Sequence, residues 1–171
     1  MRKTTIALAL LVAWVFVVPM GWAQKYDDKE HAELAKALKG VKITLEKGLS
    51  ASESQGKPIS GKFEVEDGKL QLSVYTMKGD KFSEVIVDHK TGKVAKTEAI
   101  TGGGDLTAAK AQSGAMAKAK VSLRSATEKA VKANNGFRAV SVTPSLKDGH
   151  PVAEITLVKA EEFKTASEEL D

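Results

Sequence analysis

Cysteine is absent from this chain of 171 residues, and tryptophan is almost absent. The lack of cysteine excludes disulfide bonds, thiolate metal sites and a cysteine nucleophile, and it also excludes a lipid-modified N-terminal cysteine. The two tryptophans, Trp14 and Trp22, both lie near the N-terminus. The folded part of the chain must therefore be held together by packing alone.

A concentration of charge of one sign is missing as well. The formal net charge is +4, and Arg2 and Lys3 contribute two of these charges, so the rest of the chain carries about +2. The lysines are spread along the sequence and form no basic cluster. A nucleic-acid partner is therefore not expected.

The N-terminal segment has the organisation of an export signal. Two basic residues are followed by an apolar run over residues 6–18 and by the small residues of Gly21-Trp22-Ala23. The apolar run is shorter than the roughly 20 residues that a membrane-spanning helix needs. The pattern predicts a signal peptide over residues 1–23, a mature N-terminus at Gln24, a periplasmic or extracellular location and no stable membrane anchor.

The rest of the sequence contains an internal repeat. Residues 42–45 (Lys-Ile-Thr-Leu) match residues 120–123 (Lys-Val-Ser-Leu). Further along, residues 74–78 match residues 155–159 in the same order. Self-similarity of this kind indicates two modules of one design.

A run of three glycines, residues 102–104, separates the two copies. Consecutive glycines are poor candidates for the interior of a helix or a strand. We therefore predict a linker at residues 102–104, a first module over residues 24–101 and a second over residues 105–171. We expect residues 24–101 to fold on their own.

Each module is predicted to contain helices followed by strands. Asp28 and Thr44 are suited to cap two helices in the first module, and Ser122 is suited to cap a helix that follows another near residues 106–118. Three strands are expected in each copy, near residues 61–66, 69–76 and 82–87 in the first and near residues 137–143, 152–158 and 162–167 in the second. The predicted fold class is α+β, with one or two helices packed on one face of a small antiparallel sheet in each module.

One motif carries a resemblance to a known family. Residues 87–94, VDHKTGKV, end a predicted hairpin, and a strand-turn-strand and a helix opened by Ile-Thr-Leu precede it. This arrangement resembles the PepSY domain, and the chain as a whole resembles two such modules in tandem. PepSY domains are similar to parts of the propeptides of secreted metallopeptidases and often occur in exported bacterial proteins. The second module departs from the pattern, because residues 166–171 are polar and lack the closing turn.

Catalytic and metal-binding patterns are missing from the sequence. His31, His89 and His150 lie outside any H-E-x-x-H or H-x-H pattern, and we interpret all three as solvent-exposed side chains. No serine lies in a G-x-S-x-G pattern. Asp88 is better suited to bonding the backbone amides near Thr91 than to holding a metal. We therefore expect no enzyme activity, no cofactor and no metal.

A binding protein is the class that remains, and two kinds are open. The PepSY resemblance implies a protein-interaction module that binds, inhibits or regulates an exported enzyme such as a peptidase. The alternative is a carrier of a small molecule or envelope ligand. A carrier needs an enclosed cavity, and small alanine-rich helices on three-stranded sheets leave little room for one.

A candidate binding patch follows from the strand near residues 69–76. Its apolar residues alternate toward the predicted helices, which leaves Tyr75 and Met77 on the opposite face with nothing in the sequence to cover them. We predict that this face is open and that Tyr75 and Met77 form the centre of a patch that binds a protein partner. The alternative is that Tyr75 packs on neighbouring side chains or meets the other module there.

Overall fold

The computed structural model describes residues 20–171, with side chains from residue 29 onward. The predicted signal peptide therefore lies outside the described residues over positions 1–19, and its cleavage stays a prediction. Within the described part of the chain, no helix is both long enough and apolar enough to cross a membrane.

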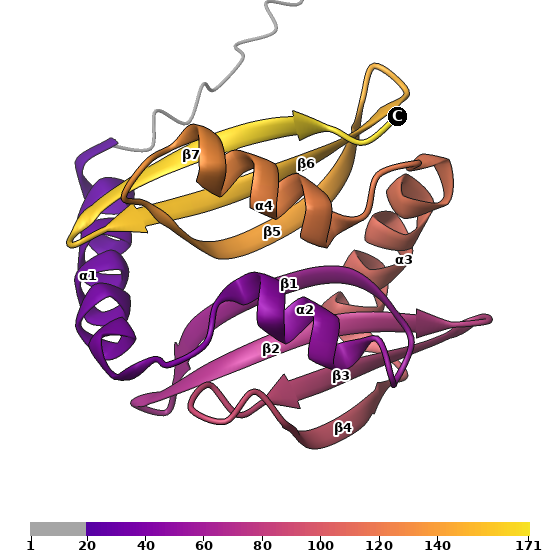
Figure 1. The fold of residues 1–171 in the computed structure, drawn as a ribbon, viewed down its shortest axis with the longest axis horizontal. Coiled ribbons are helices and arrows are strands. Elements are labelled where there is room, and N and C mark those ends of the chain that lie inside the picture. The colour runs from indigo at the N-terminus through magenta and orange to yellow at the C-terminus, as the bar shows by residue number, and fades with distance from the viewer. Residues whose placement is uncertain (1–19) are drawn as a thin grey trace, which may run out of the picture.

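The two halves of the chain repeat one order of elements (Figure 1). The first half consists of α1 (Met20–Ala37), a 3₁₀ turn η1 (Leu38–Gly40), α2 (Leu45–Ser52), β1 (Lys57–Glu66), β2 (Lys69–Lys78), β3 (Lys81–Val87) and β4 (Val94–Ile100). The second half consists of α3 (Gly103–Lys118), α4 (Leu123–Ala133), β5 (Arg138–Lys147), β6 (His150–Lys159) and β7 (Glu162–Glu169).

All of these strands join one antiparallel sheet in the order β4-β3-β2-β1-β5-β6-β7. The predicted α+β class is confirmed, but the two small sheets expected from the sequence are continuous. Their junction, which we call the seam, is a ladder of two residue pairs between β1 and β5, Gly61 with Val142 and Lys62 with Ser141. The outer strands β4 and β7 form the edges of the sheet.

The seam has an internal two-fold relation. The register between β1 and β2 is irregular between Pro58 and Ser60, and the register between β5 and β6 is irregular at the equivalent place, between Ala139 and Ser141. When the two halves are aligned at these irregularities, Gly61 is equivalent to Val142. Gly61 also faces Val142 across the seam. Each half therefore presents the same strand position to the other.

The helix starts follow the local sequence signals. The Thr44 hydroxyl accepts a hydrogen bond from the Lys47 amide at 3.3 Å, and the Ser122 hydroxyl accepts one from the Ser125 amide at 3.1 Å. Both predicted caps are confirmed, and each satisfies an amide that the helix cannot pair itself. The cap predicted at Asp28 is wrong, because α1 begins at Met20 and Asp28 lies inside the helix.

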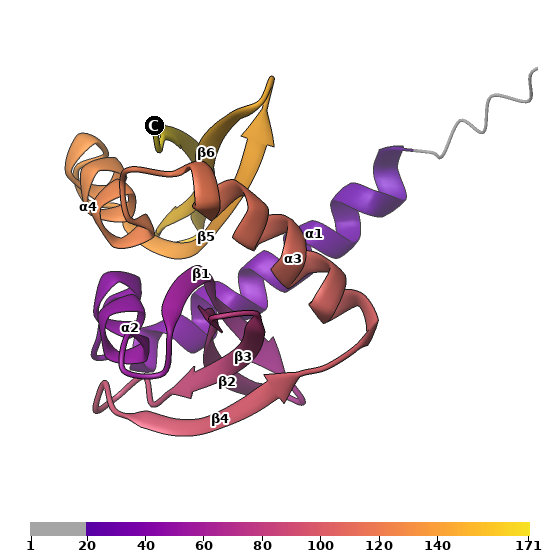
Figure 2. The ribbon, with the colours of Figure 1, turned by 90° about the vertical axis from the view of Figure 1, so that its right-hand side faces the viewer.

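The helices α2 and α4 lie side by side on one face of the sheet (Figure 2). Gly61 allows α2 to approach closely, since a Cβ atom there would lie 3.1 Å from Leu49 Cδ2 and 3.4 Å from Leu45 Cδ1. The core that results includes residues from both halves and is continuous. Its fully buried members include Leu45, Leu49, Ile59, Leu72, Val74, Val85, Ile155 and Leu157.

The glycine run opens a helix. Gly102 is extended and precedes α3, and Gly103 and Gly104 form the first residues of that helix. Gly103 has φ of +69°, a backbone conformation in which glycine has no Cβ penalty. The domain boundary at residues 102–104 stays a prediction, and α3 runs from this point across the side of the sheet opposite α2 and α4 (Figure 2).

The strand β4 was not expected, since the sequence predicted three strands in the first module. Its burial pattern explains the difference, because Ala95 to Ala99 are all exposed and only Val94 and Ile100 are partly buried. A strand without a buried face shows no alternation of apolar and polar residues. The β-structure of this segment comes from pairing with β3 instead.

Candidate functional site

The PepSY-like motif forms a tight turn between β3 and β4. Asp88 Oδ1 accepts hydrogen bonds from the backbone amides of Lys90, at 2.9 Å, and Thr91, at 2.7 Å. The amide of Asp88 donates to the carbonyl of Lys93, and the amide of Gly92 donates to the carbonyl of Asp88, both at 2.8 Å. The predicted role of Asp88 in bonding the amides near Thr91 is confirmed.

These amides hold the pKa of Asp88 below its usual value of 3.8, with the Thr91 amide as the largest cause. When a carboxyl group has a lower pKa in the folded chain than in the unfolded chain, it stabilises the fold at pH values above its unfolded-state pKa. This stabilisation is lost as the pH falls through the folded-state pKa.

We therefore expect the carboxyl carbon of Asp88 to titrate at a lower pH in the folded chain than in the unfolded chain. We also expect Asp88→Ala to lower the free energy of unfolding more at pH 7 than at pH 2. NMR titration and urea unfolding at the two pH values measure this, and titration at or above the unfolded value would contradict it.

The turn is anchored to the start of α2. The amide of Lys42 donates to the carbonyl of His89 at 3.0 Å. Gly92 has φ of +73°, and a Cβ there would touch Ile43 Cγ2 at 3.4 Å. The turn thus packs against the segment that leads into α2, which fixes where β4 begins.

The second half replaces this anchor by a different segment. The carbonyl of Leu170 accepts hydrogen bonds from the amides of Lys120, at 2.6 Å, and Val121, at 2.9 Å. Lys120 is the repeat equivalent of Lys42, and the Leu170 side chain is fully buried. The second module therefore keeps the contact to its helix start while lacking the closing turn and the extra strand.

The turn leads directly into β4, whose outer edge pairs with no other described strand. Residues 95–99 of this strand are exposed on both faces. Lys96 and Glu98 form an ion pair at 2.8 Å along the strand. The turn therefore places an exposed edge strand of seven residues directly after it.

The predicted patch at Tyr75 and Met77 is covered, so the expectation of an open face is wrong. The Tyr75 hydroxyl donates to Asp105 Oδ1 at 2.9 Å, and the Ser113 hydroxyl lies 2.8 Å from Met77 Sδ. Both partners belong to α3, and both Tyr75 and Met77 are partly buried against the core. This is the alternative in which Tyr75 meets the other module, and whether either residue contacts a partner stays a prediction.

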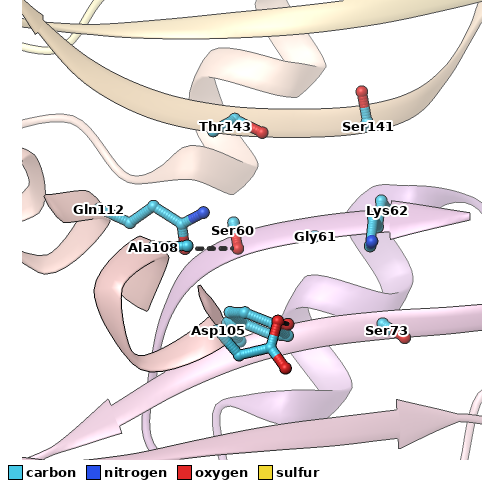
Figure 3. A pocket seen from close by; sticks show the side chains of 10 residues that line it. Ser60, Gly61, Lys62, Ser73, Asp105, Ala108, Gln112, Ser141 and Thr143 are labelled. Atoms are coloured by element: carbon cyan, nitrogen blue, oxygen red, sulfur yellow. Dashed lines mark hydrogen bonds between the residues drawn. The ribbon is translucent and has the colours of Figure 1, made fainter. Parts of the chain in front are cut away.

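A polar pocket lies beside this helix at the seam, and we call it the seam pocket (Figure 3). Its volume is about 330 Å³. The residues that line it come from β1, β2, β5 and α3, and they are Ser60, Gly61, Lys62, Ser73, Tyr75, Asp105, Ala108, Gln112, Ser141 and Thr143. Hydroxyl groups dominate this lining.

Internal bonds satisfy much of the pocket wall. The Ser60 hydroxyl donates to Gln112 Oε1 at 2.8 Å, and Lys62 pairs with Glu64 at 2.6 Å. Burial raises the pKa of Tyr75 well above its usual range, and the bond to Asp105 adds to the effect. Tyr75 therefore stays protonated at neutral pH and acts as a donor.

Sequence reasoning missed most of this pocket, because its walls meet only through the pairing of β1 with β5. No local pattern predicts which strands of two modules will join. A signal was nevertheless present in the repeat, since Ser60 and Ser141 are equivalent positions beside the pair of Gly61 and Val142. A glycine inside a strand often marks a close approach to another element, and Gly61 stands next to the first of these serines.

The three histidines do not come together. His150 is exposed, as predicted, and its Nδ1 lies 2.8 Å from Asp171 Oδ2. His31 and His89 are partly buried, so the prediction of full exposure is wrong for them. His31 stacks on Phe163 with ring centroids 4.1 Å apart. Within residues 29–171, no three His, Asp or Glu side chains are grouped as a metal site would require.

Comparisons with known proteins give little further guidance. No protein-family model matches the chain, and no curated protein matches its sequence. A solved structure from Clostridium difficile 630, described as a "putative lipoprotein", is similar with a TM-score of 0.35 and 12% sequence identity, over 68% of this chain and 86% of that chain. A similarity at this level assigns neither a family nor a function. The PepSY resemblance stays a prediction from the residues.

Proposed function

We propose that this chain is an exported, non-enzymatic binding protein of PepSY type, and that it binds an extended segment of another exported protein along the outer edge of β4. A peptidase is the kind of partner that the resemblance implies. The observation that carries the proposal is the free edge of β4, placed immediately after the PepSY-like turn.

An open strand edge offers a row of unpaired backbone donors and acceptors, and an extended peptide can add to it as a further strand. The edge of β4 is seven residues long, and its start is fixed by the turn at Asp88. The small side chains of Ala95 and Ala99 leave the backbone accessible from the exposed faces. Together these features suit recognition through the main chain.

Lysine on an edge strand commonly serves to prevent such pairing. In β4 the ammonium of Lys96 is paired with the carboxylate of Glu98. The two charges cancel, so the strand carries no net repulsion toward an incoming segment. The other edge strand, β7, carries the acidic residues Glu162, Glu168 and Glu169 against one basic residue, Lys164. Within residues 29–171, only Glu168 of these three has an ion-pair partner, Lys129.

A binding role also agrees with the polar groups that the structure places together. Among the described residues, no serine or threonine hydroxyl bonds to a histidine or to a lysine ammonium, which are the usual activating bases. The hydroxyls instead bond to backbone carbonyls and amides, side-chain amides, one carboxylate, one thioether and one another. This pattern supports packing and binding, and it offers no activated nucleophile.

The proposal is tested first by site-specific photo-cross-linking in the exporting cell. A cross-linking amino acid is placed at Thr97 in β4, and the matched control is Thr165 in β7, a threonine on the opposite edge that is also exposed. We expect a protein to be captured from Thr97 and not from Thr165. Equal capture at both positions would contradict the proposal that the partner binds specifically along the edge of β4.

The captured protein is then purified and added to the chain for amide hydrogen exchange. Strand addition would slow exchange at the outward amides of residues 94–100, whereas a contact through side chains alone would leave them fast. Unchanged exchange in β4 with a bound partner would rule out the edge as the binding site. Exchange in β7 serves as the internal control.

A further inference from the structure

We propose a second binding function that is independent of the β4 edge: the seam pocket binds a small, uncharged polyhydroxyl ligand of about the size of one sugar ring. Four features of the pocket lead to this class of ligand: its shape, its charge, its free hydrogen-bonding groups and an apolar surface beside them.

The shape results from the short seam. The strands β1 and β5 pair at two positions only, and beyond Lys62 and Ser141 their ladder ends. The helix α3 closes the side of the space that opens, with Asp105, Ala108 and Gln112 facing the strands (Figure 3). The volume of about 330 Å³ lies at the lower end of the range of roughly 300–1,000 Å³ for ligand sites. A single ring fits this space better than a chain of several.

The pocket offers little to a charged ligand. The ammonium of Lys62 lies 2.6 Å from the carboxylate of Glu64, so it presents no unpaired charge to an anion. The carboxylate of Asp105 accepts a hydrogen bond from the neutral Tyr75 hydroxyl and keeps its negative charge, but it is exposed to solvent, where an ion pair with a cation contributes little. A ligand without net charge avoids the loss of hydration that either ion would suffer.

Among the described residues, hydrogen-bonding groups without a partner remain on β5 and on α3. The hydroxyls of Ser141 and Thr143 have no side-chain hydrogen bond within residues 29–171, and the Nε2 amide group of Gln112 has none there either, since only its Oε1 accepts from Ser60. A hydroxyl both donates and accepts, and the amide nitrogen donates. Neighbouring hydroxyls on a ligand, each a donor and an acceptor, complement this set.

An apolar surface is available beside these groups. The ring of Tyr75 forms part of the wall, and Ala108 and Gly61 add small contacts. A polyhydroxyl ring has polar edges and a face of C–H groups, and such a face packs on an aromatic ring. A tyrosine ring together with hydroxyl and amide groups suits a polyhydroxyl ring better than a simple ion, which has no apolar face to pack on the tyrosine.

The test is an NMR titration of the purified full chain with three neutral probes, glucose, N-acetylglucosamine and inositol. Gluconate and glucosamine are the charged comparators. We expect at least one neutral probe to shift the amide signals of residues 60–62, 105–112 and 141–143 saturably. The double variant Ser141→Ala with Thr143→Val should weaken that binding about tenfold, because two hydrogen bonds are lost. Ser125→Ala, an exposed residue of α4 on the other face of the sheet, should leave it unchanged.

Two results would overturn the proposal. The first is the absence of saturable shifts in these residues with all three neutral probes up to about 100 mM, a very weak limit of affinity. The second is tighter binding of gluconate or glucosamine than of the neutral probes, which would mean that Lys62 or Asp105 recognises an ion. The amide spectrum of each variant reports directly whether it is folded, and Gln112→Leu provides a second variant on another element if the double variant is not.

Discussion

Replacing Leu49 by alanine is expected to lower the free energy of unfolding by about 2–5 kcal/mol. The Leu49 side chain is fully buried, and it packs over Gly61 where α2 crosses β1. The surrounding elements cannot close the cavity easily, because β1 is held between β2 and β5. A loss of this size is a large part of the stability of a chain this small.

Urea unfolding followed by circular dichroism measures the effect. The control is Leu146→Ala, since Leu146 is 45% exposed near the end of β5. We expect this change to alter stability by about 0.5 kcal/mol or less. Equal losses for the two variants would show that Leu49 does not lie in a tightly packed core.

Alanine is expected to have opposite effects at two helical glycines. In α2, a Cβ atom at Gly48 would overlap Leu72 Cδ2 and lie 3.2 Å from Leu72 Cγ, and Leu72 is itself fully buried. Overpacking of this kind costs about 1–3 kcal/mol, which exceeds the gain of about 1 kcal/mol from removing a helical glycine. Gly48→Ala should therefore destabilise the protein.

Gly114 in α3 provides the matched comparison. It is exposed, and a Cβ atom there would meet nothing within 4 Å. Gly114→Ala should raise the free energy of unfolding by about 0.5–1 kcal/mol. The new methyl group meets no clash, and alanine loses less backbone conformational entropy than glycine when the chain folds. The melting temperatures of the two variants should move in opposite directions. Movement in the same direction would contradict the close approach of α2 to β2.

Local chemistry predicted the parts of this fold that short segments determine. Thr44 and Ser122 cap helices because a hydroxyl reaches an amide three residues on, and this requires no information from elsewhere in the chain. Leu72 and Val74 are buried because alternation places them on the helix side of β2. The Asp88 turn follows in the same way from residues within one segment.

The misses concern contacts between distant segments. The alternating pattern of β2 placed Tyr75 and Met77 correctly on the face opposite α2, but it held no information on which element covers that face. The helix α3 supplies the cover through Asp105 and Ser113, and its own sequence is alanine-rich and almost without an amphipathic pattern. A helix that docks through scattered polar contacts leaves little periodic signal.

The candidate sites divide along the same line. The motif that led to the β4 edge was visible in the sequence, while the edge itself was not, because β4 has no buried face. The seam pocket depends on the pairing of Gly61 with Val142, which is a contact between modules. Its residues could be recognised as a group only once the sheet was known to be continuous.

The two-pair seam is only part of the contact between the halves, because α2 packs against α4 and the core runs through both halves. Two isolated copies of one half would meet through the same strand position, as the subunits of a symmetric dimer do. A covalent connection turns that encounter into an intramolecular one at an effective concentration in the millimolar range. The chain thus has the form of a symmetric dimer whose subunits are joined, and the two halves differ at their ends. The first half carries the closing turn and the edge strand β4, and the second carries the buried Leu170 in their place.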